Sequence, residues 1–203
     1  WGMRDYGHDD QIGAEENIQH YVKSLVTCFR EVRRVLREDG SFWLNIGNTY
    51  TSGGRAWRAP DNKNKGRAMS YRPDTPEGLK PKDLIGVAWM VAMALQLDGW
   101  YLRSDIIWHK PNCQPESVKD RVTVSHEYLF MLTKSEKYYF DQSAIKERTA
   151  DGRAMKNKRT VWAINTEPCK EAHFAVFPRD LVRPCILAGS PPGGLVLDPV
   201  SYT

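Results

Sequence analysis

An amphipathic helical pattern, a glycine and a short apolar run follow one another near the start of the chain, and this order limits the folds open to it. Between Glu15 and Arg37, apolar residues recur at every third or fourth position, which is the spacing of one buried helix face. Gly40 follows a basic last turn, as expected at a helix end. The run 41–47 (SFWLNIG) is typical of a buried strand. Together these segments form half of a parallel α/β unit.

Helical and strand patterns continue to alternate along the rest of the chain. Helices are predicted at 80–98 and 178–188, and strands at 100–108, 127–133, 161–164 and 195–198. A turn at 134–137 is predicted to lead into a short strand at 138–140. This alternation favours an open, doubly wound, mostly parallel sheet, and such sheets bind ligands beyond the carboxyl ends of their strands. The last strand ends in Asp198, whose carboxylate suits the amino or hydroxyl groups of a cofactor.

Length and composition exclude several other classes of protein. The 203 residues, of which 41% are hydrophobic and 27% charged, can bury a sizeable core. No apolar run reaches the roughly 18 residues of a membrane span, and the first residues lack the pattern of a signal peptide. The four cysteines lie far apart, which predicts reduced thiols rather than a zinc site or disulfides. We therefore expect a cytoplasmic protein.

Positive charge is concentrated in two segments of a chain whose net charge is only +4. Segment 52–78 holds six Lys/Arg against three Asp/Glu, and segment 148–159 holds five Lys/Arg against one Asp. The rest of the chain is therefore slightly acidic. Basic excursions on an acidic body indicate a polyanionic partner, and two solvated loops are the alternative.

Ten strings, spread over nearly the whole chain, carry a resemblance when they are taken together and in order. They are WGMRDYG (1–7), QIGAE (11–15), REVRRVLREDG (30–40), FWLNIGNTY (42–50), LKPKDLIGVAW (79–89), DGWYLRSDIIWHKPN (98–112), ESVKDRVTVSHEYLFMLTKSEKYYFD (116–141), VWAINT (161–166), AHFAVFPRDLVRPCILAGSPPGG (172–194) and LVLDP (195–199). The series resembles the permuted β-group of bacterial and phage DNA amino-methyltransferases.

The resemblance implies a Rossmann-like fold, of which residues 1–203 form a single partial methyltransferase domain, and a role in DNA methylation and restriction-modification. The methyl group passes from S-adenosylmethionine to an exocyclic amino group, adenine N6 or cytosine N4, in double-stranded DNA. Such an amine is a poor nucleophile, so the base must leave the stack and be held in line with the sulfonium. A cognate restriction endonuclease or a second copy of the chain is the expected protein partner.

By resemblance, one set of residues lines the cofactor pocket: His173, Phe174, Phe177, Asp198 and Pro199. The alternative is that the two phenylalanines belong to the core and that the histidine stands at a helix start with its hydrogen bonds satisfied. For the aspartate, the alternative is an acid at a strand end that caps a following helix.

A second set is expected to border the pocket of the flipped base: Trp1, Arg4, Tyr6, Asn45 and Asn48. For Trp1, Arg4 and Tyr6, a frayed terminus without a role is the alternative. Family members often carry an acid where Asn48 stands, and a turn-forming asparagine is the alternative there. A third set is expected to contact DNA, from a proline-broken loop and from the two basic segments. It comprises His109, Lys110, Asn112, Arg55, Arg58, Lys63, Lys65, Arg67, Arg153, Lys156, Lys158 and Arg159. For the loop residues, a solvated loop held by its prolines is the alternative. No metal site is expected, because His109 has no second ligand at a usable spacing.

Two family motifs are not found in the 203 residues. An (Asp/Ser)-Pro-Pro-Tyr tetrapeptide normally stands before the first string, and glycines normally follow Asp198-Pro199, where Val200 to Thr203 stand here. We therefore expect a fragment that is inactive alone. A catalytically inactive DNA-binding remnant, or one part of a split methyltransferase, is the alternative. A nucleotide-binding oxidoreductase is disfavoured, because no Gly-x-Gly-x-x-Gly follows a strand.

Overall fold

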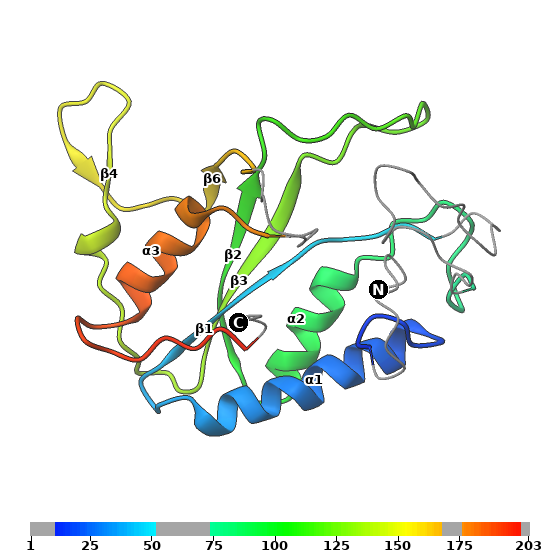
Figure 1. Cartoon of the computed structure of the whole chain (residues 1–203), viewed down its shortest axis with the longest axis horizontal. Coiled ribbons are helices and arrows are strands. Elements are labelled where there is room, and N and C mark those ends of the chain that lie inside the picture. Colours follow the sequence, from blue (N-terminus) through cyan, green and yellow to red (C-terminus); the bar gives the residue numbers. More distant parts are fainter. Residues whose placement is uncertain (1–10, 52–73, 168–175, 200–203) are drawn as a thin grey trace. The chain divides into compact units, whose positions relative to one another are not determined.

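A computed structural model describes residues 11–51, 74–167 and 176–199 of the chain, which divides into two compact units. The helical unit comprises residues up to Arg34 together with Gly47–Asp98, and the sheet unit comprises Val35–Ile46 and the residues from Gly99 onward. Figure 1 shows the elements of both units. No described helix is long and apolar enough to cross a membrane.

The helical unit holds two helices, α1 (Ile18–Val35) and α2 (Val87–Leu97). The apolar face predicted for α1 is confirmed, with Ile18, Val26 and Phe29 buried. In α2, five of the eleven residues are buried. The Arg30 guanidinium on α1 binds both carboxylate oxygens of Asp98, just after α2, with Nε 2.9 and 3.0 Å from them. This bidentate pair ties the two helices together.

The start predicted for the second helix, at residue 80, is wrong, because residues 83–85 pair with residues 49–51. The amide of Thr51 donates to the Asp83 carbonyl at 3.0 Å, and the amide of Ile85 donates to the Thr49 carbonyl at 3.0 Å. A bridge between Tyr50 and Leu84 lies between these two bonds. Backbone groups that pair in this way cannot take part in a helix, so α2 begins only at Val87.

The sheet unit is built on four strands, β1 (Ser41–Ile46), β2 (Tyr101–His109), β3 (His126–Thr133) and β6 (Val161–Ala163), in the order β1-β3-β2-β6. The prediction of a mostly parallel sheet is wrong for this described sheet. Strand β3 is antiparallel to both β1 and β2, and only β2 and β6 pair in parallel. The reason is the connection between β2 and β3, which contains no helix and returns the chain directly beside the strand it left.

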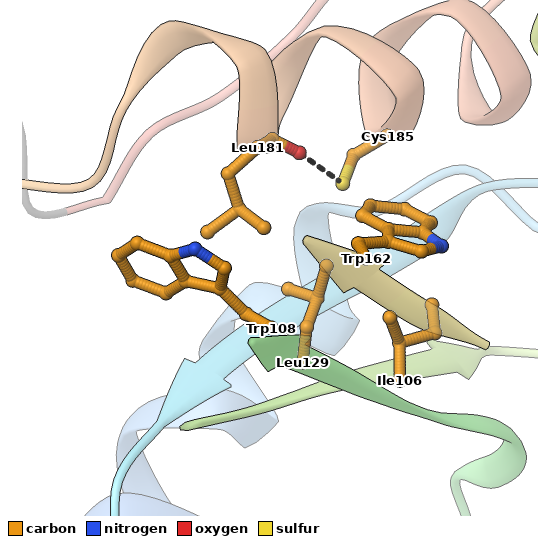
Figure 2. Close-up of a cluster of buried hydrophobic side chains, with 6 residues drawn as sticks. All are labelled: Ile106, Trp108, Leu129, Trp162, Leu181 and Cys185. Carbon is orange, nitrogen blue, oxygen red and sulfur yellow. Dashed lines mark hydrogen bonds between the residues drawn. The ribbon is translucent and has the colours of Figure 1, made fainter. Parts of the chain in front are cut away.

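Helix α3 (Arg179–Gly189) covers the sheet, and Figure 2 shows their shared core. Leu181 and Cys185 of α3 pack on four sheet residues, Ile106, Trp108, Leu129 and Trp162. The Cys185 thiol donates to the Leu181 carbonyl at 3.3 Å, and burial raises its pKa to about 12. A thiol in this environment is a small core residue and not a nucleophile.

Between β3 and β6 lie a short 3-10 helix, η2 (Ser143–Ile145), and a two-stranded hairpin of β4 (Glu147–Arg148) and β5 (Met155–Lys156). The strand predicted at 138–140 is wrong, because the Tyr139 amide donates outside the sheet, to the Asp39 carbonyl at 2.8 Å. The strand predicted at 195–198 is also wrong. These residues pair with no strand of the described chain, and Val196 and Leu197 are 58% and 64% exposed.

Candidate functional site

Two tryptophans on neighbouring strands organise the candidate site of the sheet unit. Trp108 on β2 and Trp162 on β6 are directly paired in register, close to the carboxyl end of both strands. Both indoles face α3 in the buried core (Figure 2). Their ring nitrogens are satisfied locally, since Trp108 Nε1 donates to the Ile164 carbonyl at 2.9 Å and Trp162 Nε1 donates to the Arg159 carbonyl at 2.6 Å.

A lysine ammonium lies over the indole ring of each of these tryptophans. The ammonium of Lys110 lies 4.2 Å from the Trp108 ring centroid, and that of Lys158 lies 4.8 Å from the Trp162 ring centroid. Both distances are within the range of a cation–π contact. One residue of the proline-broken loop and one residue of the second basic segment, which stand 48 positions apart in the sequence, therefore each lie over one indole of the same strand pair.

The loop residues predicted to contact DNA are held firmly at the end of β2. The Lys110 ammonium forms an ion pair with Glu127 of β3, and its side chain is only 18% exposed. The Asn112 side chain accepts from the Thr166 amide at 2.8 Å and donates to the Thr166 carbonyl at 3.1 Å. His109 is the last residue of β2 and pairs with His126. These bonds make the start of the loop a fixed platform.

The second basic segment is arranged around one acid, Glu147 of β4. Lys156 Nζ and Arg159 Nε lie 3.5 and 3.1 Å from the same Glu147 oxygen. Burial raises the pKa of Glu147, but the hydrogen bond from Arg159 and the charges of Lys156, Arg159 and Lys158 outweigh it and lower that pKa. Arg153 lies at the tip of the hairpin, 3.9 Å from Asp151 and 87% exposed. The segment thus presents a net positive surface.

Two asparagines predicted at the base pocket make backbone contacts. Asn45 Nδ2 on β1 donates to the Tyr128 carbonyl of β3 at 3.0 Å. Asn48 Oδ1 accepts from the amide of Ala88 at 3.0 Å, in the first turn of α2, so it acts as an N-cap supplied from a distant part of the chain. The other base-pocket residues, Trp1, Arg4 and Tyr6, lie outside the described residues.

The predicted cofactor residues are described only in part. Phe177 stands just before α3 and is 46% exposed. Asp198 and Pro199 are exposed. His173 and Phe174 lie outside the described residues, as do Arg55, Arg58, Lys63, Lys65 and Arg67 of the first basic segment. In the described residues no group of three or more His, Cys, Asp or Glu could hold a metal ion.

Sequence reasoning missed the acids that position the basic residues. Glu127 and Glu147 are single carboxylates in unremarkable strings, and their partners stand 17 and up to 12 positions away. The spacing of opposite charges gives no signal without the strand register. Alternation along 100–108 did indicate that Trp108 faces the core.

Comparison with solved structures gives the class of fold. The PvuII DNA methyltransferase, named as cytosine-N4-specific, matches with a TM-score of 0.64 and 18% identity, over 92% of this chain and 60% of that one. A Thermus thermophilus protein assigned as a DNA modification methylase, solved with S-adenosyl-L-methionine, matches with a TM-score of 0.50 and 17% identity, over 87% of this chain and 61% of that one. The chain therefore has a DNA methyltransferase fold.

Sequence comparison gives the family. The profile of the DNA methylase family (N6_N4_Mtase) matches residues 2–201. The type II methyltransferases M.SmaI of Serratia marcescens and M.Cfr9I of Citrobacter freundii are 68% and 63% identical to this chain, each over 98% of it. The chain belongs to the DNA methylase family, which is a family of enzymes, and the resemblance drawn from the ten strings is confirmed. It spans 68% and 66% of the lengths of these two relatives.

Proposed function

We propose that this protein is a type II DNA amino-methyltransferase. It transfers a methyl group from S-adenosylmethionine to adenine N6 or cytosine N4 of a base that has left the stack of double-stranded DNA. The observation that carries the proposal is the family match over residues 2–201, together with relatives that are 60–68% identical over 98% of the chain. Identification of the methylated nucleoside distinguishes the two target bases.

The geometry at the paired tryptophans supports DNA as the substrate. Lys110 and Lys158 lie over Trp108 and Trp162, which are paired on neighbouring strands. Arg153 and Arg159 in the preceding segment are exposed. Guanidinium and ammonium groups on a fixed scaffold suit phosphate oxygens, which position a duplex without reading its sequence. The proposed interface also includes Lys156, His109 and Asn112, and the basic residues of segment 52–78.

The described residues of the proposed cofactor site fit S-adenosylmethionine by their chemistry. The Asp198 carboxylate is an acceptor for amino or hydroxyl donors, and Phe177 offers an exposed aromatic face to an adenine ring. The cofactor supplies the electrophilic methyl group. The residues of this chain would bind and orient it, within a doubly wound, Rossmann-like complete domain. A DNA substrate in a bacterium or phage implies a cytoplasmic location, and a cognate endonuclease or a second copy of the chain is the proposed partner.

The direct test of the proposal measures methyl transfer by the full-length protein. Unmethylated phage DNA is incubated with tritiated S-adenosylmethionine, and the modified nucleoside is identified by mass spectrometry. We expect either N6-methyladenine or N4-methylcytosine, within a short recurring sequence that is mapped by sequencing. DNA binding without any methyl transfer would instead favour the inactive remnant.

A substitution tests the cofactor site. Asp198→Ala should weaken S-adenosylmethionine binding by about tenfold, which corresponds to the loss of a hydrogen bond to a charged group. The measurement is isothermal titration calorimetry on the full-length protein. The matched control is Asp180→Ala, which removes an exposed carboxylate from α3. Equal affinities of both variants for S-adenosylmethionine would show that Asp198 does not contact the cofactor.

A further inference from the structure

The connection between β2 and β3, which we name the β2–β3 arm (residues 110–125), ends in an exposed apolar tip. Figure 1 shows it as a long excursion without helix or strand, leaving the sheet at the carboxyl end of β2 and returning to the start of β3. Val122 is 87% exposed, and Val118 and Val124 are 40% and 36% exposed. Apolar side chains that gather on one projecting loop form a candidate contact surface for a partner.

An ion pair holds the tip in shape. Arg121 Nη1 lies 2.5 Å from Glu116 Oε2 and also donates to the Val122 carbonyl at 3.0 Å. Both side chains are about a quarter to a third exposed, so solvent screens the pair only in part. The amide of Val124 lies 3.4 Å from the same Glu116 oxygen. One carboxylate therefore reaches both sides of Val122, and the valine is presented on a closed turn.

The base of the arm is continuous with the proposed DNA interface. The Lys110 amide donates to the Ser125 carbonyl at 2.7 Å, which joins the two ends of the arm beside the Lys110–Glu127 pair. Residues 116–125 hold two acids and two bases, so this tip does not attract phosphates through net charge. A partner for it must offer an apolar surface next to a phosphate backbone. The base faces that are uncovered when a base leaves a DNA duplex do so.

We propose that Val122 enters the DNA duplex as an apolar wedge and occupies the space that the target base leaves. This inference rests on the proposed function and adds a residue that stabilises the open duplex. Glu116 and Arg121 position the wedge through the backbone of the turn. Apolar side chains inserted between base steps stabilise unstacked DNA, and the cost of unstacking is smallest for a mismatched base.

The test compares two duplexes that carry the mapped methylation site, one fully paired and one with a mismatch opposite the target base. Val122→Asp places a charge against the stack, and we expect its rate of methyl transfer on the paired duplex to fall by about tenfold or more, since unstacking costs a few kcal/mol. On the mismatched duplex the rate should return to within about threefold of the unsubstituted protein, because less unstacking is needed. Val122→Ile, which keeps an apolar tip, should retain activity on both.

Controls separate the wedge from other roles. Val35→Ala alters another exposed valine, 56% exposed at the end of α1, and should change neither rate. An equal loss on both duplexes, or no loss, would overturn the wedge. A change in sedimentation of the DNA-free Val122→Asp protein would assign the tip to contacts between copies instead. Absence of methyl transfer by the unsubstituted protein on either duplex would contradict the proposed function itself.

Discussion

Two arms of the sheet unit differ in what they can offer to DNA. The β2–β3 arm has an apolar tip and balanced charges, and Glu116 and Arg121 hold it in shape. The segment 147–159, which we name the basic arm, holds five Lys/Arg against two acids and is arranged around Glu147. The β2–β3 arm begins just after Trp108 and the basic arm ends just before Trp162, so the same scaffold carries both. Under the two proposals above, the basic arm provides affinity for the DNA backbone, and the β2–β3 arm inserts into the base stack.

The largest effect should come from damaging the shared scaffold. Leu181→Ala removes a side chain that is 2% exposed and packs on the tryptophans, and should lower the free energy of unfolding by about 2–5 kcal/mol. The measurement is denaturant unfolding of the full-length protein. DNA affinity and methyl transfer should then fall together on warming. Leu187→Ala on the same helix, where Leu187 is 46% exposed, should cost far less. If only one of the two activities fell, the arms would not share this scaffold.

A smaller effect separates the two arms. Replacing Arg153, Lys158 and Arg159 together by alanine should weaken DNA binding on the order of 30-fold and reduce the salt dependence of log K by about 2 to 3, one contribution for each lost phosphate contact. Fluorescence anisotropy at several potassium chloride concentrations measures both. Val122→Asp should leave the salt slope unchanged. Alanine at the exposed Lys23, Arg34 and Arg183 is the matched control. An unchanged salt slope in the basic-arm variant would show that these three residues do not contact phosphates.

The smallest effect concerns the acid of the basic arm. Glu147→Gln removes the charge that Lys156 and Arg159 share, and should strengthen DNA binding by a few-fold at neutral pH. Because the pKa of Glu147 is lowered in the folded protein, its ion pairs stabilise the fold above the ordinary glutamate range. That stabilisation is lost as the pH falls through the lowered pKa. Thermal unfolding between pH 7 and 3 should therefore show a smaller pH dependence for Glu147→Gln. Identical curves would show that the pairs contribute nothing.

Most helices and strands could be predicted from the sequence, because their patterns are local. The periodicity between Glu15 and Arg37 gave α1, and the apolar runs gave β1, β3 and β6. The direction of β3 could not be predicted, since an apolar run such as EYLFMLT reads the same for either direction. The start of α2 failed for a different reason. It depends on pairing between residues near Tyr50 and Leu84, more than thirty positions apart.

The candidate site was predictable in its residue types and not in its contacts. Lys110 and Lys158 stand in strings that signal charge, but the placement of the two lysine–tryptophan pairs on neighbouring strands depends on the register of Trp108 against Trp162. The contact between Asn48 and Ala88 likewise joins positions 40 apart. The activity could be predicted from the resemblance to a family. The arrangement of the side chains could not, because it depends on long-range strand pairing that no local pattern encodes.

The reversal of β3 has a consequence for how proteins of this shape can diversify. Because β2 and β3 are neighbours, both ends of the connection between them are anchored at one place, and its length can vary without shifting any strand. Each doubling of such a loop costs only about 0.6 kcal/mol in closure entropy. We therefore expect the core to tolerate changes of length in the part of the connection beyond Asn112, at little thermodynamic cost.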